Sequence, residues 1–167
     1  MPPKVIAIAA MDEGRVIGIA NRLPWHVPED AKRFMTLTKG HTVLMGRKTY
    51  DSLPEKFKPL PRRKNVVATR DPSKFLAPKE VEVCHSPVAY IQNCLSTETK
   101  LATDILWIVG GEEIYRLTLP FWDELYLTVV HSRNDGDAFF PEFEDQFELC
   151  ESDKREGYTF LLYRRKK

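Results

Sequence analysis

Cysteine is scarce in this chain, and its cysteines and histidines form no metal-binding pattern. The three cysteines, Cys84, Cys94 and Cys150, are an odd number without Cys-x-x-Cys spacing, and the four histidines are scattered along the sequence. A disulfide framework and a zinc site both require more regular spacing than this. We therefore predict no metal centre and a reducing, cytoplasmic environment.

Long hydrophobic runs are also missing. A membrane-spanning helix needs about 20 consecutive apolar residues, and no run in the sequence approaches that length. The apolar run from Val5 to Ala10 is followed closely by Asp12 and Glu13, so it is better interpreted as a buried strand than as part of a signal peptide. We predict an unprocessed chain that does not bind a membrane.

Neither sign of charge dominates the composition. The chain has 25 Lys and Arg residues and 24 Asp and Glu residues, which gives a formal net charge of +1 at pH 7. This balance gives no global electrostatic reason to expect a nucleic-acid partner. The basic stretches 56–64 and 164–167 are short and nearly free of interleaved aromatic residues, so we interpret them as solvated surface rather than as a nucleic-acid-binding module.

The two commonest nucleotide fingerprints, G-x-G-x-x-G and G-x-x-x-x-G-K-[ST], are absent. Three other segments nevertheless follow predicted strands with residues suited to anion binding: 46–49 (Gly-Arg-Lys-Thr), Thr69-Arg70 and Gly110-Gly111. Glycines let a ligand approach the backbone closely, and cations and hydroxyls bind phosphate. Each segment alone is equally consistent with an ordinary turn that carries solvated charges.

The pattern of apolar residues predicts an α/β fold in one domain over residues 1–167. A length of 167 residues and an apolar content of 43% are normal for one globular domain. Strands are expected at 5–10, 42–45, 65–69, 105–109, 124–130 and 158–163, and helices at 29–38, from 47 for a short turn, at 87–95 and at 112–119. Alternation of the two favours a mostly parallel sheet, and the last strands, which lack helices between them, favour an antiparallel edge.

Asp30 lies at the beginning of a predicted helix. Pro28 suits the first helical position, and Asp30 then falls in the first turn, where a carboxylate complements the helix dipole. That role alone would explain the residue. However, Asp30, Phe34 and Leu37 stand at i, i+4 and i+7, which predicts a shared helical face that we expect to be buried. Burial would raise the pKa of the carboxyl group and suit it to proton chemistry near neutral pH.

At this point the sequence resembles a known family. The motifs, in order, are Val16-Ile17-Gly18, Asn21, Leu23-Pro24-Trp25, Pro28, Asp30, Phe34, Met45-Gly46-Arg47-Lys48-Thr49-Tyr50, Leu60-Pro61, Arg63, Asn65, Thr69-Arg70, Val109-Gly110-Gly111, Ile114-Tyr115, Leu127-Thr128, Gly136-Asp137 and Phe140-Pro141. Over nearly the whole chain they resemble dihydrofolate reductase of the bacterial, single-domain type. The resemblance implies three layers, with a central sheet of about eight strands and about four flanking helices.

The resemblance implies NADPH as the cofactor. Arg47, Lys48 and Thr49 would hold the pyrophosphate and the adenosine side, Arg70 would lie near the 2′-phosphate, and the Gly110-Gly111 pair would touch the cofactor and carry a cis peptide bond. The other implied cofactor residues are Ala10, Ile17, Gly18, Asn21, Arg22, Leu23, Gly46, Thr69, Glu112, Ile114 and Tyr115. Glu112-Glu113 departs from family members that have a glycine and a basic residue there, which leaves Arg47 and Arg70 to set the preference for NADPH.

The implied substrate is dihydrofolate. Asp30 would pair with the pterin ring, Thr128 would support Asp30 through a hydrogen bond, Phe34 would pack against the ring, and Arg63 would bind the glutamate α-carboxylate. Without the family, Arg63 would be interpreted as a solvated member of the basic run 62–64. The apolar walls would come from Ile8, Ala10, Leu60 and Val109, and Ala31 replaces a larger aliphatic side chain.

The implied reaction is hydride transfer from nicotinamide C4 of NADPH to C6 of 7,8-dihydrofolate with protonation of N5, which yields tetrahydrofolate for one-carbon metabolism. Asp30 is the only ionisable side chain expected at the centre, and it would act indirectly, with water as the immediate proton donor. Leu23 and Trp25 would belong to a closing loop, and Tyr115 would lie beside the reacting atoms. Trp25 alone would equally suit a core anchor.

The expected partners are dihydrofolate and folate-analogue inhibitors, and the expected state is a monomer. Two alternatives come from other classes. A ligand-binding protein that has lost catalysis would not need Asp30, Trp25 and Tyr115 together. The pyrimidine reductase of riboflavin biosynthesis would not obviously need Asp30 beside Leu-Pro-Trp.

Overall fold

The computed structural model describes residues 2–20 and 22–167. In chain order its elements are β1 (Lys4–Asp12), β2 (Val16–Gly18), α1 (Pro28–Thr38), β3 (Thr42–Gly46), α2 (Arg47–Asp51), β4 (Lys64–Ala68), β5 (Glu82–Cys84), α3 (Pro87–Leu95), β6 (Ile105–Ile108), α4 (Glu112–Thr118), β7 (Glu124–Val130), β8 (Ala138–Phe139), β9 (Phe147–Lys154) and β10 (Tyr158–Arg165). Within the described ranges, no helix combines the length and the apolar character needed to cross a membrane.

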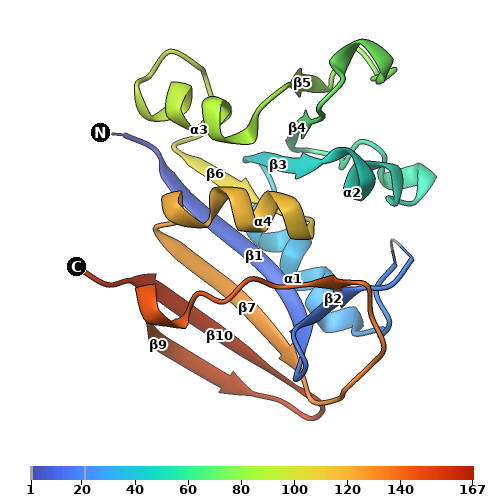
Figure 1. Cartoon of the computed structure of the whole chain (residues 1–167), viewed down its shortest axis with the longest axis vertical. Coiled ribbons are helices and arrows are strands. Elements are labelled where there is room, and N and C mark those ends of the chain that lie inside the picture. Colours follow the sequence, from blue (N-terminus) through green and yellow to red (C-terminus); the bar gives the residue numbers. More distant parts are fainter. Residues whose placement is uncertain (1, 21) are drawn as a thin grey trace.

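The central sheet has eight strands in the order β5-β4-β3-β6-β1-β7-β10-β9. The strands from β5 to β7 pair in parallel, whereas β10 pairs antiparallel with both β7 and β9. Figure 1 shows the antiparallel strands at one side of the molecule, where the chain ends. The predicted mostly parallel sheet with an antiparallel C-terminal edge is confirmed.

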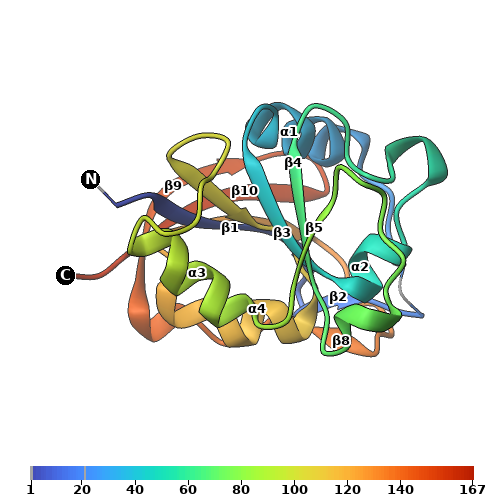
Figure 2. The same ribbon diagram turned by 90° about the horizontal axis from the view of Figure 1, so that it is seen from above.

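Alternate residues of β1 face opposite sides of the sheet. Val5 and Ala7 belong to the core that α3 and α4 cover, whereas Ile6 and Ile8 belong to the core under α1. Side chains of a strand alternate in this way, and a parallel sheet buried on both faces therefore needs apolar residues at nearly every position. Figure 2 shows the result, with α1 on one face and α3 and α4 on the other, so the three-layer arrangement is confirmed.

Four strands were not expected from apolar runs. Most of β9 is exposed and polar, and it forms the edge of the sheet beside β10, where charged residues are tolerated because one side of the strand is unpaired. The short β5 lies at the opposite edge. The strands β2 and β8 have three and two residues and pair with each other in a separate sheet. The expected elements are all present, with ends that differ by one or two residues.

The carboxyl ends of the parallel strands meet at one edge of the sheet. There the turn after β3 touches the turn after β6, because the Gly46 amide donates to the Gly110 carbonyl oxygen at 2.9 Å. Open α/β sheets bind ligands at this edge. The fold therefore gathers segments that lie far apart in the sequence.

Candidate functional site

Asp30 and Thr128 meet where α1 crosses the end of β7. The Thr128 hydroxyl donates to Asp30 Oδ1 at 2.5 Å, and Thr128 itself is almost fully buried. The parallel register sets Thr128 beside Ala10 of β1. A hydrogen bond to a charged acceptor is short and strong, so this contact fixes one oxygen of the carboxylate and leaves the other available to a ligand.

The pKa of Asp30 is raised above its ordinary value because burial disfavours the ionised carboxyl group, while the Thr128 hydrogen bond and the nearby Arg33 charge act in the opposite direction. Asp30, Phe34 and Leu37 share a face, as expected, but that face is half-buried rather than buried. The predicted burial of this face is therefore only partial. The first turn of the helix lies at the edge of the sheet, so the sheet cannot cover it completely.

Tyr115 lies in the core beside this acid. Its hydroxyl donates to the Ile8 carbonyl oxygen at 2.6 Å, and its ring packs edge-on against Phe140 and Trp122. Burial raises the pKa of Tyr115, and the charge of Asp30 adds to that effect. A buried, bonded phenol of this kind stays protonated, and its hydrogen bond holds α4 against the middle of β1 at Ile8. It is not the free aromatic group that would stack on a ligand.

The glycine turns after β3 and β6 leave little room for side chains. A Cβ added at Gly111 would lie 3.2 Å from Thr49 Oγ1, and one added at Gly46 would lie 3.0 Å from Ile114 Cγ1. Gly110 has a φ of +123°, which L side chains rarely adopt, and the Gly110–Gly111 peptide bond is cis, as the resemblance implied. These turns expose backbone beside a threonine hydroxyl, which is the environment that a phosphate group needs.

Three cations border these turns. Lys48 and Arg47 are exposed at the start of α2, where Arg47 Nε lies 3.4 Å from Asp51 Oδ2. Arg70 follows β4, and its guanidinium forms an ion pair with Glu113 of α4. Glu113 therefore neutralises one of the two arginines expected to favour a phosphorylated ligand.

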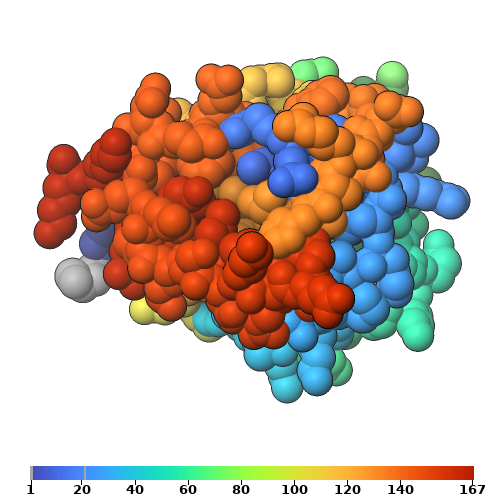
Figure 3. Space-filling view, turned by 90° about the horizontal axis from the view of Figure 1, so that it is seen from below, coloured from blue at the N-terminus to red at the C-terminus, as the bar shows by residue number. Residues whose placement is uncertain are grey.

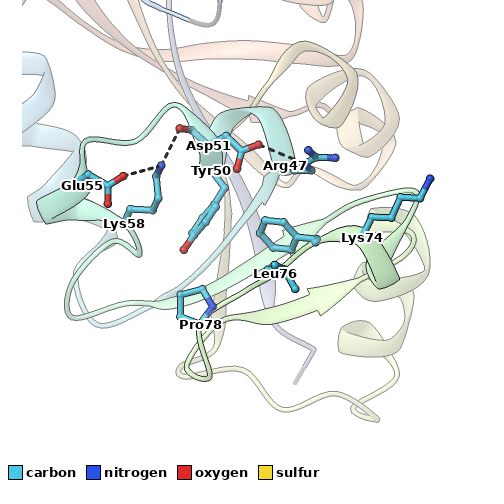
Figure 4. A pocket seen from close by; sticks show the side chains of 9 residues that line it. Arg47, Tyr50, Asp51, Glu55, Lys58, Lys74, Leu76 and Pro78 are labelled. Atoms are coloured by element: carbon cyan, nitrogen blue, oxygen red, sulfur yellow. Dashed lines mark hydrogen bonds and ion pairs between the residues drawn. The ribbon is translucent and has the colours of Figure 1, made fainter.

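A separate pocket of about 430 Å³ lies beside α2 (Figure 4). Its walls include Tyr50 and Phe75, whose rings meet edge-on, and Lys58, which lies 3.5 Å from Glu55 and donates to the Asp51 carbonyl oxygen. Neither Asp30 nor the glycine turns line this pocket. It is therefore distinct from the cluster around Asp30.

Arg63 is attached to the end of α1. Its side chain donates to the Thr38 hydroxyl at 3.1 Å and to the Pro61 carbonyl oxygen at 2.9 Å. The buried side chain of Asn65 stabilises the loop that contains Leu60 and Arg63. Its oxygen accepts a hydrogen bond from the Leu60 backbone amide, and its nitrogen donates to the carbonyl oxygens of Leu60 and Arg63. The solvated interpretation of Arg63 was wrong, and Asn65, which had no expected role, is the residue that shapes this loop.

The segment between β2 and α1 forms a short loop. Ile19 and Arg22 bond to each other through both backbone amides, and the Asp137 carboxylate accepts from the Ala20 amide at 3.0 Å while the Asp137 amide donates to the Gly18 carbonyl oxygen. Figure 3 shows blue atoms of the region around β2 bordered by the orange segment that contains β8, the strand with which β2 pairs. The loop expected to close over ligands is thus attached to a distant part of the chain.

The tip of this loop is open to solvent. Leu23 is 58% exposed, and Trp25 is half-buried. Trp25 is therefore no core anchor, which leaves it available to a ligand. The prediction for Asn21 lies outside the described residues.

Asp12 is a buried residue beside the site whose structural role was not expected from the sequence. Its fully buried carboxylate accepts hydrogen bonds from the amides of Gly14, Val16 and Asn134, and from the Asn134 side chain. Burial alone would raise the pKa of Asp12, but these hydrogen bonds outweigh burial and lower it. The ionised Asp12 therefore joins the β1–β2 turn to the segment after β7. The sequence Asp12-Glu13-Gly14 was the available signal, because an aspartate two residues before a glycine is typical of a turn in which the carboxylate accepts backbone hydrogen bonds.

The remaining expected residues surround the same sheet edge with different exposures. Ile8, Gly18, Leu60, Thr69 and Ile114 are buried; Ala10, Ile17, Val109 and Glu112 are half-buried; Arg22 and Ala31 are exposed. Glu112 accepts a hydrogen bond from the Phe139 amide at 2.5 Å, so its carboxylate joins α4 to β8. No group of three metal-binding side chains occurs in the part of the chain that the structure describes.

Comparison with known proteins agrees with this geometry. The family model described as dihydrofolate reductase matches residues 4–165. The dihydrofolate reductase of Bacillus subtilis is 36% identical over 95% of this chain and 93% of its own, and that of Neisseria gonorrhoeae is 38% identical over 96% and 97%. A solved structure of dihydrofolate reductase from Enterococcus faecalis, complexed with NADP(H) and RAB-propyl, has a TM-score of 0.83 and 30% identity, and the match covers 98% of this chain and 97% of that one. With sequence, fold and site in agreement over almost its full length, the chain belongs to the dihydrofolate reductase family.

Proposed function

We propose that the residues gathered around Asp30 carry out the reaction of this family, the NADPH-dependent reduction of 7,8-dihydrofolate to 5,6,7,8-tetrahydrofolate. The observation that carries the assignment is the Asp30–Thr128 hydrogen bond at the same sheet edge as the Gly46 and Gly110–Gly111 turns. In this proposal Asp30 binds a heterocycle, and the glycine turns at the same sheet edge hold a phosphorylated cofactor. Each of the roles below follows from that arrangement.

The glycine turns fit NADPH. A Cβ at Gly111 would press on the Thr49 hydroxyl and one at Gly46 on Ile114, so glycine lets both turns pack closely and leaves the Thr49 hydroxyl uncovered by a neighbouring side chain at Gly111. Thr49 would hold the pyrophosphate with Arg47 and Lys48, and Arg70 would lie toward the 2′-phosphate. Ala10, Ile17, Gly18, Asn21, Arg22, Leu23, Thr69, Gly110, Glu112 and Tyr115 would surround the rest of the cofactor.

Asp30 would bind the pterin through the carboxylate oxygen that Thr128 does not fix. The carboxylate and a protonated pterin attract each other, so Asp30 stabilises the form of the substrate that already carries a proton near N5. The guanidinium of Arg63 lies 5.9 Å from the Phe34 ring centre, which places a cation for the substrate's carboxylate beside an apolar surface for its aromatic group. Ile8, Ala10, Ala31, Leu60 and Val109 would complete the walls.

When bound, NADPH supplies the hydride that passes from its nicotinamide C4 to C6 of dihydrofolate. The protein's own tasks are to align the rings, to exclude water and to retain the proton at N5. Leu23 and Trp25 would cover the site as the loop closes, and Tyr115 would hold β1 in place at Ile8. Asp30 acts through pterin binding, and water delivers the proton.

The first experiment measures the loss of NADPH absorbance when the purified chain is mixed with dihydrofolate, in parallel with NADH and with the pyrimidine substrate of riboflavin biosynthesis. Rapid oxidation that requires dihydrofolate and prefers NADPH is the expected result. Oxidation that requires the riboflavin-pathway substrate would overturn the proposed substrate. Tight NADPH binding without turnover would support a binding protein that has lost catalysis.

We also infer that the chain works as a single-domain monomer in the cytoplasm. One sheet includes strands from both ends of the sequence, β1 and β10, which supports a single domain. Its ligands would be dihydrofolate and folate-analogue inhibitors, with no nucleic acid or membrane among its partners. Size-exclusion chromatography with light scattering tests the monomer, and a dimer mass would contradict it.

A further inference from the structure

The helix α1 begins with a residue that cannot cap it. Val27 occupies the N-cap position, and its apolar side chain cannot accept a hydrogen bond as Ser, Thr, Asp or Asn would. The helix α3 provides a comparison within the same chain, because it also begins with a proline but is capped by Ser86, whose hydroxyl accepts from the Ala89 amide at 3.1 Å. The first turn of α1, which contains Asp30, therefore lacks an anchor that α3 has.

An arginine from the connection between β9 and β10 contacts this turn instead. Arg155 Nη1 donates to Glu29 Oε1 at 2.5 Å, and Glu29 directly precedes Asp30. The same guanidinium donates to both carboxylate oxygens of Asp153, at 3.0 and 2.8 Å, and its carbon lies 5.4 Å from the centre of the Phe160 ring. A bidentate carboxylate and an aromatic face restrict the orientation of a planar guanidinium. Arg155 therefore offers Glu29 a donor in a defined position.

The turn that contains Arg155 is itself attached to the end of β7. The Arg155 amide donates to the Tyr158 carbonyl oxygen at 2.8 Å, and the His131 amide, directly after β7, donates to the Gly157 carbonyl oxygen at 2.8 Å. Figure 1 shows the connection between β9 and β10 at the end of the sheet where β7 ends. The position of this connection relative to β7 is therefore fixed.

The first turn of α1 is thus joined to the end of β7 by two routes. Thr128 of β7 bonds directly to Asp30, and the β9–β10 connection holds the neighbouring Glu29 through Arg155. Consecutive residues of a helix point about 100° apart, so the two contacts act on different sides of the same turn. A single contact at Asp30 would leave the turn free to rotate about it, and the second contact restricts that rotation.

We propose that Arg155 is a positioning residue that, through Glu29, holds the first turn of α1 and hence the Asp30 carboxylate in the orientation that binds the pterin. The catalytic consequence rests on the proposed function, because Asp30 is the acid that binds the substrate there. The side chains of Arg155 and Glu29 are 43% and 47% exposed, and exposed ion pairs contribute measurably when they form a network with bidentate geometry. Loss of this contact should therefore change binding by about two- to fivefold.

Hydrogen exchange tests the anchor without any substrate. The amides of Asp30 and Ala31 both donate to the Val27 carbonyl oxygen, so their exchange, measured by NMR, reports the opening of the first turn. In Arg155→Met these two amides should exchange about two- to fivefold faster than in wild type, whereas the amides of α3 should keep their wild-type rates.

Steady-state kinetics measure the consequence for the site. In Arg155→Met the KM for dihydrofolate should rise about two- to fivefold, and the KM for NADPH should not change. A merely structural role would reduce the amount of folded enzyme and so lower the apparent kcat, but it would leave the KM for dihydrofolate unchanged. The control is Arg164→Met, because Arg164 also lies on this hairpin but pairs with Glu124, at 3.5 Å. It should change neither the exchange of the first turn nor either KM.

A cap introduced at Val27 provides a rescue experiment. Val27→Thr gives the N-cap position a hydroxyl on a side chain of similar shape, which can hold the same turn by another route. Added to Arg155→Met, it should restore most of the protection from exchange and most of the wild-type KM for dihydrofolate. Rescue by a residue that does not contact Arg155 would show that the arginine acts by holding this turn.

Unchanged exchange in Arg155→Met, faster exchange with an unchanged KM for dihydrofolate, or equal effects of Arg164→Met would each overturn the proposal, as would failure of the rescue. If Arg155→Met does not fold, Glu29→Gln removes the same ion pair from the other side and replaces it in every measurement. Wild-type protein that does not reduce dihydrofolate would instead refute the proposed function, and the exchange measurement would still decide whether Arg155 anchors α1.

Discussion

Replacement of Asp30 by Asn should separate stability from catalysis. Because burial raises the pKa of Asp30 in the folded state, the folded protein binds this proton more tightly than the unfolded chain does. The stability that this site contributes is therefore fully present below the unfolded pKa, for which the ordinary value is 3.8, and is lost as pH rises toward the raised folded pKa. Above the folded pKa of Asp30 this contribution to the free energy of unfolding no longer changes with pH.

Asp30→Asn removes the charge that burial disfavours and keeps a side-chain oxygen for the Thr128 hydroxyl, which donates at 2.5 Å in the wild type. Because the variant lacks a charge that burial disfavours, we expect it to be more stable than wild type at pH 7, by on the order of 1 kcal/mol, as is typical of a stabilising single substitution. For a domain of this size that is a rise of about 2–4 °C in melting temperature. Near pH 3, where the wild-type carboxyl is protonated, the difference should vanish.

Hydride transfer should respond in the opposite way. At neutral pH the Asn variant cannot attract a protonated pterin, and we expect a rate about 10²- to 10⁴-fold lower. At acid pH the substrate arrives already protonated, so the deficit should shrink. Calorimetry and stopped-flow kinetics over the same pH series measure both effects. An unchanged pH–rate profile, or a variant less stable than wild type at pH 7, would refute the reasoning.

Three further substitutions test the surroundings of the site. A Cβ at Gly136 would lie 2.3 Å from Val16 Cγ1, so Gly136→Ala should lower the free energy of unfolding by about 1–3 kcal/mol in denaturant unfolding. The control Gly14→Ala, whose added Cβ would have its nearest contact at 3.4 Å, should lower it by less than about 1 kcal/mol. Equal losses of stability in the two variants would contradict the packing argument. Glu113→Gln removes the ion-pair partner of Arg70 and should tighten NADPH binding about three- to tenfold in fluorescence titration. The affinity for NADH should not change, because only NADPH carries the 2′-phosphate. Equal tightening for both cofactors would show that Arg70 does not contact the 2′-phosphate.

The hydrophobic pattern was sufficient for the central strands and the helices. Strands buried on both faces must be apolar throughout, so β1 and β7 are visible as local runs. The edge strand β9 was invisible because most of its side chains face solvent, and β2 and β8 are too short for any period to emerge. Their pairing depends on contacts between distant residues, which no local pattern encodes.

The same division applies to the site. Asp30, the glycine turns and the cations after β3 and β4 were visible in the sequence, because a turn that must admit a ligand needs particular residue types at particular spacings. The hydrogen bond between Thr128 and Asp30 was implied only by the family resemblance. The neutralisation of Arg70 by Glu113 was not identifiable, since the two residues are 43 positions apart and meet only when β4 and the start of α4 reach the same sheet edge.

The sequence by itself determined the family and the order of the central strands and the helices. Tertiary structure alone decided how strongly each group acts. Burial raises the pKa of Asp30, whereas the hydrogen bonds from Val16 and Asn134 lower that of Asp12, although both are single carboxylates near turns. The difference arises because the free energy of a charge depends on the dipoles and the solvent that surround it in three dimensions, and folding brings those from distant parts of the chain.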